Sequence, residues 1–201
     1  LYVITLYFPF GLMQGGLAMQ VPANLFKLLE YSNEQIGLIS GIGLVASLRF
    51  VYAPWLDGAT TKRRLSLITL TLGSLIAFLM ATITFLSPAR DAYLWLMVVS
   101  LFVVAFVNAG HETAADGYYI RALNPKRQAE FIGIKTASIR IGIISATTGL
   151  VLLATKIAES YGSIGYESED KSGFYTGFGT AFAVSAVVIL LIAIYNKFMI
   201  P

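Results

Sequence analysis

Hydrophobic residues gather into six long runs that are separated by short polar segments. A helix needs about 20 mostly apolar residues to cross the hydrocarbon core of a bilayer. Six runs reach this length, at about residues 1–26, 35–56, 65–86, 92–120, 131–155 and 174–195. The pattern therefore predicts an all-α membrane protein, with one six-helix transmembrane domain over residues 1–201.

Composition supports this prediction. Hydrophobic residues make up 57% of the chain and charged residues only 12%, whereas soluble domains carry about 25% charged residues. The buried helical core of a large soluble protein is the alternative, but six consecutive runs with alternating loop charge argue against it. The absence of cysteine excludes a disulfide framework, a thiolate zinc site and a cysteine nucleophile.

The loop charges predict the orientation of the spans. The loops after the second, fourth and sixth spans carry most of the basic residues, whereas acids outnumber cations in the other loops. Cytoplasmic loops are the ones enriched in Lys and Arg. Both ends of the chain are then cytoplasmic, which requires an even number of crossings. The basic residues after the second, fourth and sixth spans are Lys62, Arg63, Arg64, Arg121, Lys126, Arg127 and Lys197.

Charged residues within the spans are confined to the second, fourth and fifth, so the third and sixth are expected to face lipid. Such charges usually face the bundle interior or a water-filled cavity. At ~1.5 Å per residue, Arg49, Glu112 and Arg140 lie near the bilayer midplane. Asp116 and Lys135 form a second level nearer the cytoplasmic face. Glu112 and Asp116 are four residues apart and share one helix face.

Two interpretations of these charges remain open. They line a polar cavity in which the acids of one helix face basic residues of its neighbours, or they form ion pairs that only fix helix packing. Lys135 could instead reach the interface by snorkelling. His111 is either a hydrogen-bonded packing residue or a proton relay, and Asn108 is a further candidate for support of this region.

An intramembrane metalloprotease is excluded by one position. His111 and Glu112 begin like the HExxH zinc motif, but Ala115 stands where the second histidine is needed. His111 is also the only histidine of the chain. We therefore expect no metal site, no cofactor and no enzymatic activity.

Several stretches resemble a known transporter family. Pro54–Gly58, followed by Lys62–Arg64, resembles the loop between helices two and three of the major facilitator superfamily. Longer matches resemble the AmpG-type muropeptide permeases, although Arg49 and Glu112 stand where that family has lysine and aspartate. These matches lie in residues 36–57, in His111–Tyr118 and in Ser138–Gly142, and the resemblance covers roughly residues 10–159.

The resemblance implies the amino-terminal half of a twelve-helix secondary transporter. Such a transporter uses the proton gradient to import cell-wall muropeptides across the bacterial inner membrane. Its partners would be the lipid bilayer, protons, a small anionic substrate and the carboxy-terminal six-helix half, with no nucleic acid. Acetyl-coenzyme A carriers belong to the broader family, and the matched motifs do not separate the two. A non-transporting membrane scaffold with this fold is a further alternative.

Roles for individual residues follow from this resemblance and from their chemistry. Arginine binds a carboxylate through a planar fork, so Arg49 and Arg140 are predicted to anchor the substrate. The protonation of an intramembrane acid depends on nearby cations and on hydration, so Asp116 and Glu112 are predicted to couple proton movement.

Among the acids, we expect Glu112 to stay ionised beside Arg140, and Asp116, beside Lys135, to exchange its proton. A cytoplasmic gating loop is expected at Asp57, Lys62, Arg63 and Arg64.

Overall fold

The computed structural model of the chain describes residues 2–41, 51, 54–56, 58, 60–87, 89–165 and 168–199. Within these ranges every regular element is a helix, and five stretches are long and apolar enough to cross a membrane. They correspond to the first, third, fourth, fifth and sixth predicted spans, which confirms an all-helical architecture over the described residues with five candidate membrane-spanning helices. The five are Tyr2–Leu28, Lys62–Leu86, Arg90–Ala122, Pro125–Ser160 and Ser172–Met199.

The second predicted span, at about residues 35–56, falls largely outside the described residues. The helix α3 (Asn33–Gly41) covers its beginning, and residues 54–56 near its end are helical. Arg49 and Asp57 both lie outside the described residues. The count of six spans therefore stays a prediction.

Two of the five spans contain a stretch of wider π-helix. The first span consists of α1 (Tyr2–Gly11), η1 (Leu12–Gln20) and α2 (Val21–Leu28). The fifth consists of α8 (Pro125–Ile144), η2 (Ser145–Leu150) and α9 (Val151–Ser160). The π-helical stretches η1 and η2 pack against each other, so the irregular parts of the first and fifth spans lie side by side. The remaining spans are the unbroken helices α6 (Lys62–Leu86), α7 (Arg90–Ala122) and α10 (Ser172–Met199).

Polar residues in the loops begin several of these helices. Before α3, Ser32 and Gln35 form a reciprocal capping box, with backbone-to-side-chain distances of 3.0 and 3.3 Å. The Thr61 hydroxyl accepts from the Arg64 amide at the start of α6. The Asn124 side chain accepts from the amide of Arg127 at the start of α8. These caps set the ends of the spans close to the predicted boundaries.

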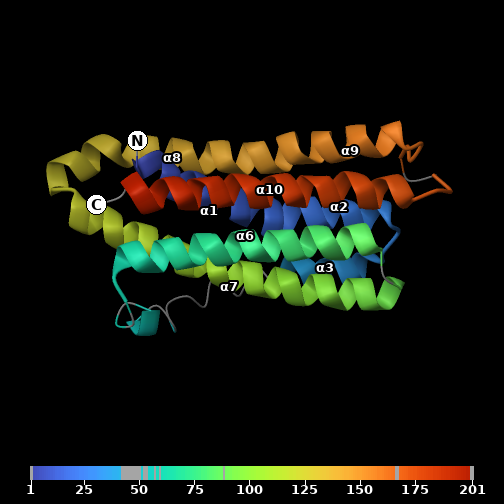
Figure 1. Cartoon of the computed structure of the whole chain (residues 1–201), viewed down its shortest axis with the longest axis horizontal. Helices are drawn as coiled ribbons and strands as arrows, with labels where there is room; N and C mark the ends of the chain where they lie inside the picture. The colour runs from blue at the N-terminus through green and yellow to red at the C-terminus, as the bar shows by residue number, and fades with distance from the viewer. Residues whose placement is uncertain are drawn as a thin grey trace.

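The long helices lie side by side along one axis (Figure 1). The helix α10 packs against α6 and α9, α6 packs against α7, and α1 packs along α8. The main hydrophobic core lies between them and includes the fully buried rings of Phe178 and Phe182 on α10. On their outer faces α6 and α10 expose apolar residues such as Leu75 and Val187, which fits the expected contact with lipid.

Glycine allows α1 and α8 to touch backbone to backbone. A Cβ atom on Gly142 would collide with the Phe8 carbonyl oxygen, and one on Gly11 would collide with the Ile139 carbonyl oxygen. Small residues at helix interfaces permit such an approach in membrane proteins. Any larger residue at either position would push α1 away from α8.

A proline in α1 is compensated by a neighbouring helix. Pro9 has no amide hydrogen, so it cannot bond the carbonyl of Thr5 within the helix. The side-chain amide of Asn196, fully buried on α10, donates to the Thr5 carbonyl at 3.3 Å. This contact ties the first span to the last.

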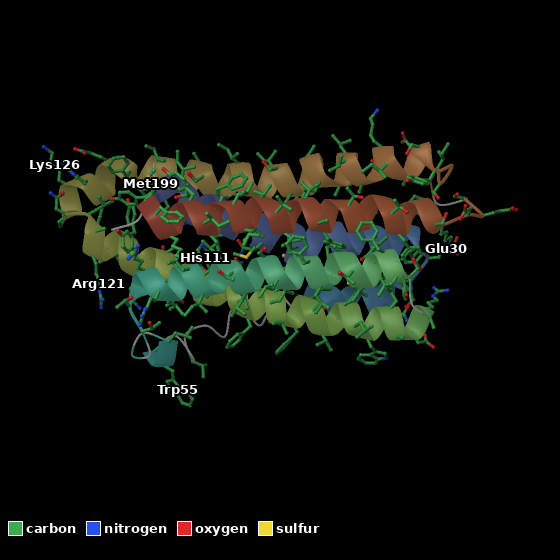
Figure 2. The ribbon with its side chains drawn as sticks, in the orientation of Figure 1. Glu30, Trp55, His111, Arg121, Lys126 and Met199 are labelled. Atoms are coloured by element: carbon green, nitrogen blue, oxygen red, sulfur yellow. The ribbon has the colours of Figure 1, made fainter. Side chains whose placement is uncertain are left out.

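The two ends of the bundle differ in charge. Arg121, Lys126 and Met199 lie at one end and Glu30 lies at the other (Figure 2), while both chain termini lie at the first of these ends (Figure 1). We call the first one the basic end, because the seven basic loop residues of the second, fourth and sixth spans belong to it.

The opposite end is held by contacts between loops. The Arg90 guanidinium donates to the Glu30 carbonyl at 2.7 Å, and Lys171 forms an ion pair with the Glu30 carboxylate at 2.9 Å. The Tyr31 hydroxyl donates to the Arg90 carbonyl at 2.9 Å. Burial raises the pKa of Tyr31 to about 12, so this hydroxyl keeps its proton, and its hydrogen bond, even at alkaline pH. We call these four residues the Glu30 latch.

The crossing of α1 and α8 predicts a difference between two glycines of one helix. Gly142→Ala should lower the free energy of unfolding by roughly 1–3 kcal/mol, because its methyl group would overlap the Phe8 carbonyl. Gly133→Ala is the matched control, since a Cβ there meets no atom within 4 Å. Thermal unfolding of the two purified variants measures the stability of each. Equal stability of the two variants would mean that the helices do not approach as closely as described.

The charge difference between the ends predicts the accessibility of introduced thiols. The chain has no cysteine, so Lys126→Cys and Ser168→Cys each create a single labelling site. We expect an impermeant maleimide added to intact cells to label the Ser168 variant, and to label the Lys126 variant only after permeabilisation. The reverse pattern would show that the basic end faces outward.

Candidate functional site

An acid and a base from different spans meet where α1, α7 and α8 come together. The Asp116 carboxylate on α7 lies 2.7 Å from the Lys135 ammonium on α8. The same carboxylate oxygen accepts a hydrogen bond of 2.7 Å from the Tyr7 hydroxyl on α1. The Asp116 side chain is 35% exposed and the Lys135 side chain 22%. The pair is thus held between helices but still open to solvent on one side.

Two aromatic rings enclose the Lys135 ammonium. Its nitrogen lies 4.7 Å from the centre of the Tyr7 ring and 5.5 Å from that of Tyr119. The two rings meet edge to face, with centres 6.0 Å apart. A cation over an aromatic face is attracted by the ring quadrupole. Lys135 therefore does not snorkel to the interface, as one interpretation of the sequence suggested, but turns inward to Asp116 and the rings.

The helices position these side chains through regular spacing. Tyr7 lies one turn before Gly11 on α1, and Lys135 lies two turns before Gly142 on α8, so both share a face with the glycine crossing. Asp116 and Tyr119 are three residues apart on α7 and also share a face. Buried apolar residues pack around the two tyrosines and exclude water from the rings, namely Val3, Leu6, Ala115 and Leu123.

A backbone contact fixes Tyr119 at the turn between α7 and α8. Its hydroxyl donates to the Gln128 carbonyl at 2.5 Å. The Gln128 side chain in turn donates to the carbonyls of Ile120 and Leu123 at the end of α7. The ring that faces Lys135 is therefore held by the same turn that sets the distance between the two helices.

The predicted pairing of Glu112 with Arg140 is not found. Glu112 is half-buried one turn from Asp116, whereas Arg140 is exposed on α8, and no ion pair joins these two described residues. The reason is the direction of the side chains. Lys135 and Arg140 are five positions apart, so their side chains point in directions that differ by about 140° around the helix axis. Once Lys135 faces α7, Arg140 has to point elsewhere.

His111 joins three helices from the interior of the bundle. The fully buried ring lies with Nε2 2.8 Å from the Leu6 carbonyl on α1 and Nδ1 3.1 Å from the Thr69 hydroxyl on α6. A carbonyl can only accept, so Nε2 carries a hydrogen and donates to Leu6. The Thr69 hydroxyl beside Nδ1 also lies within hydrogen-bond distance of the Leu65 and Ser66 carbonyls. The ring thus links α7 to α1 and α6, and its role as a packing residue or a proton relay stays a prediction.

The remaining candidates lie apart from this cluster. Asn108 is buried one turn before Glu112, and its side-chain oxygen has no hydrogen-bond partner among the described residues. Lys62 is buried at the start of α6, and Arg63 donates to the Lys197 carbonyl at 2.8 Å. The Arg64 amide is capped by Thr61.

Sequence reasoning missed both tyrosines. Tyr7 lies in a span without a charged residue, and the candidates predicted from the sequence all lie outside this first span. The signal in the sequence that could have found Tyr7 is its spacing of four residues from Gly11. A polar side chain one turn from a glycine at a close helix crossing faces the neighbouring helix.

Long apolar helices that hold a partly exposed acid–base pair between them indicate a multi-pass membrane protein with a polar site in the bundle. Two curated proteins resemble the chain, both named "Putative transporter AmpG 1". The protein from Rickettsia conorii is 30% identical over 156 residues, which is 72% of this chain. The one from Rickettsia bellii is 28% identical over 161 residues, which is 75% of this chain.

The chain spans little more than a third of these relatives, 36% and 38% of their lengths. No protein-family model matches the sequence, and no solved structure matches it. The similarity to the two relatives covers about three quarters of the chain.

The contacts of His111 predict different effects on stability for two substitutions. His111→Leu removes the donor to Leu6 and should lower the free energy of unfolding by roughly 1–3 kcal/mol. His111→Gln keeps an N–H group near the Nε2 position and should retain most of the stability, as thermal unfolding will show. A stably folded glutamine variant that loses pH-dependent activity would instead indicate that the ring itself transfers a proton.

Proposed function

We propose that the chain forms the amino-terminal half of a proton-coupled secondary transporter that imports anionic muropeptides across the bacterial inner membrane. The similarity to two proteins named as transporters supports a transport role. The major facilitator arrangement and the cytoplasmic position of the basic end belong to this proposal. The single observation that carries proton coupling is the contact of Asp116 with Tyr7 and Lys135.

In this proposal Asp116 takes up and releases the coupled proton. The ionised carboxylate is stabilised by the Lys135 ammonium and by the Tyr7 hydroxyl, both at 2.7 Å. When Asp116 is protonated the ion pair is lost, but Lys135 still faces the rings of Tyr7 and Tyr119. The site therefore holds the cation in both protonation states. The partly exposed side of Asp116 provides a path for the proton.

Arg140 is proposed to bind a substrate carboxylate. It lies on the exposed face of α8, and the described residues offer it neither a hydrogen bond nor an ion pair. Its span is the least covered of the five, with 28% of an apolar 18-residue stretch buried, against 50–61% of the corresponding stretches in the others. An open face of this kind suits a cavity shared with the carboxy-terminal half. Arg49 is proposed as the second anchor.

The proposal predicts separate effects on coupling and on exchange. Asp116→Asn removes the titrating group, so accumulation driven by a proton gradient should fall to background in proteoliposomes. Exchange of labelled for unlabelled muropeptide at equal concentrations should remain measurable, because exchange needs no net proton movement. Glu130→Gln removes an exposed acid of α8 at the same end and should accumulate substrate normally.

Full gradient-driven accumulation by the Asp116→Asn variant would rule out this residue as the coupling site. Loss of both accumulation and exchange, in protein with unchanged thermal unfolding, would assign Asp116 to substrate binding instead. Displacement of the labelled muropeptide by acetyl-coenzyme A would point to the alternative anionic substrate.

A further inference from the structure

A cavity of about 380 Å³ lies at the basic end, between the start of α6 and the end of α7. Three of the six described residues that line it carry a positive charge, and none of the six is acidic. The lining residues are Thr61, Lys62, Arg63, Tyr118, Arg121 and Ala122. The chemistry of this lining suits an anion and does not belong to the Asp116 site.

Packing holds two of these cations in place. The Lys62 side chain lies along α7 at Gly117, where a Cβ atom would come within 2.7 Å of its Cε. Only 6% of Lys62 is exposed. Arg63 is tied to the end of α10 by its hydrogen bond to the Lys197 carbonyl. Neither side chain can move away from the other positive charges without losing these contacts.

The direction of α6 adds to the positive potential. Lys62, Arg63 and Arg64 occupy the first turn of a helix of 25 residues, with no acid in that turn. The amino-terminal end of a helix carries a partial positive charge, so cations there are unfavourable and an anion is favourable. An anionic group in the cavity would interact favourably with the helix dipole and with the positively charged side chains of the lining.

The surroundings of the cavity indicate which anion would fit. From Thr61, an exposed apolar stripe continues along the same face of α6, because Ile68 follows two turns later. The stripe consists of Ile68, Leu72, Leu75 and Leu79. A phospholipid carries its phosphate directly beside its acyl chains. Its phosphate could thus lie in the cavity while an acyl chain lies along the stripe.

We infer that this cavity binds the phosphate headgroup of an anionic phospholipid from the leaflet that meets the basic end. The inference is independent of the transported substrate and of proton coupling. The cations lie on the two spans on either side of the cavity, so a bound headgroup would bridge the start of α6 to the end of α7.

The test is lipid binding to the full chain in detergent, followed by native mass spectrometry. We expect phosphatidylglycerol to bind more tightly than phosphatidylcholine. Arg121→Gln should weaken phosphatidylglycerol binding roughly five-fold, the effect of one cation near a phosphate. Arg121→Lys should restore most of it. Lys126→Gln, the same charge change at the same end but outside the cavity, should leave binding unchanged.

Three results would overturn the inference. Equal binding of the two lipids would remove the need for a negative headgroup. Equal weakening by Arg121→Gln and Lys126→Gln, in variants with unchanged thermal unfolding, would indicate diffuse attraction instead of a site. Displacement of phosphatidylglycerol by excess inorganic phosphate, with no lipid dependence, would assign the cavity to a free anion.

Discussion

Where α1 crosses α8, no side chain separates the two backbones, because Gly11 and Gly142 each face a carbonyl of the opposite helix. This contact fixes the distance between the two spans that carry Tyr7 and Lys135. Both residues lie on the same helix faces as the glycines, so the crossing brings them toward α7 and Asp116. The polar cluster therefore depends on two residues without side chains, neither of which takes part in its chemistry.

The strength of the interactions at Asp116 is consistent with a reversible contact. An ion pair that is partly exposed to solvent contributes only about 0–1 kcal/mol of stability. A cation over an aromatic ring contributes about 0.5–2 kcal/mol, depending on its exposure. The two interactions of Lys135 are thus similar in size. Neutralising Asp116 would remove one of them and leave the other, so the protonated site need not lose its structure.

The sequence predicted positions along the membrane normal better than directions around the helices. It placed Lys135 at the level of Asp116, and the two residues meet. It also placed Arg140 at the level of Glu112, and these do not meet, since depth says nothing about the side to which a helix turns its residues. The contribution of Tyr7 required knowledge of which spans touch, which hydrophobicity does not contain. Arg49 and Asp57 fall outside the described residues, so their predicted roles remain open.

The two ends of the bundle differ in how they would respond to a change of charge. At one end the Glu30 latch joins the turn before α3, the start of α7 and the loop before α10 through direct contacts of opposite or complementary groups. At the basic end three cations line the cavity between α6 and α7, and Asp116 lies on α7 five positions before one of them, Arg121. In the proposed mechanism, protonation of Asp116 removes a negative charge from the basic end, and the group that then loses its ion pair is Lys135 on α8. We therefore expect the contact of α7 with α8 and α1 at Asp116 to respond to the protonation state, whereas the latched end keeps its loops together through its own ion pair and hydrogen bonds.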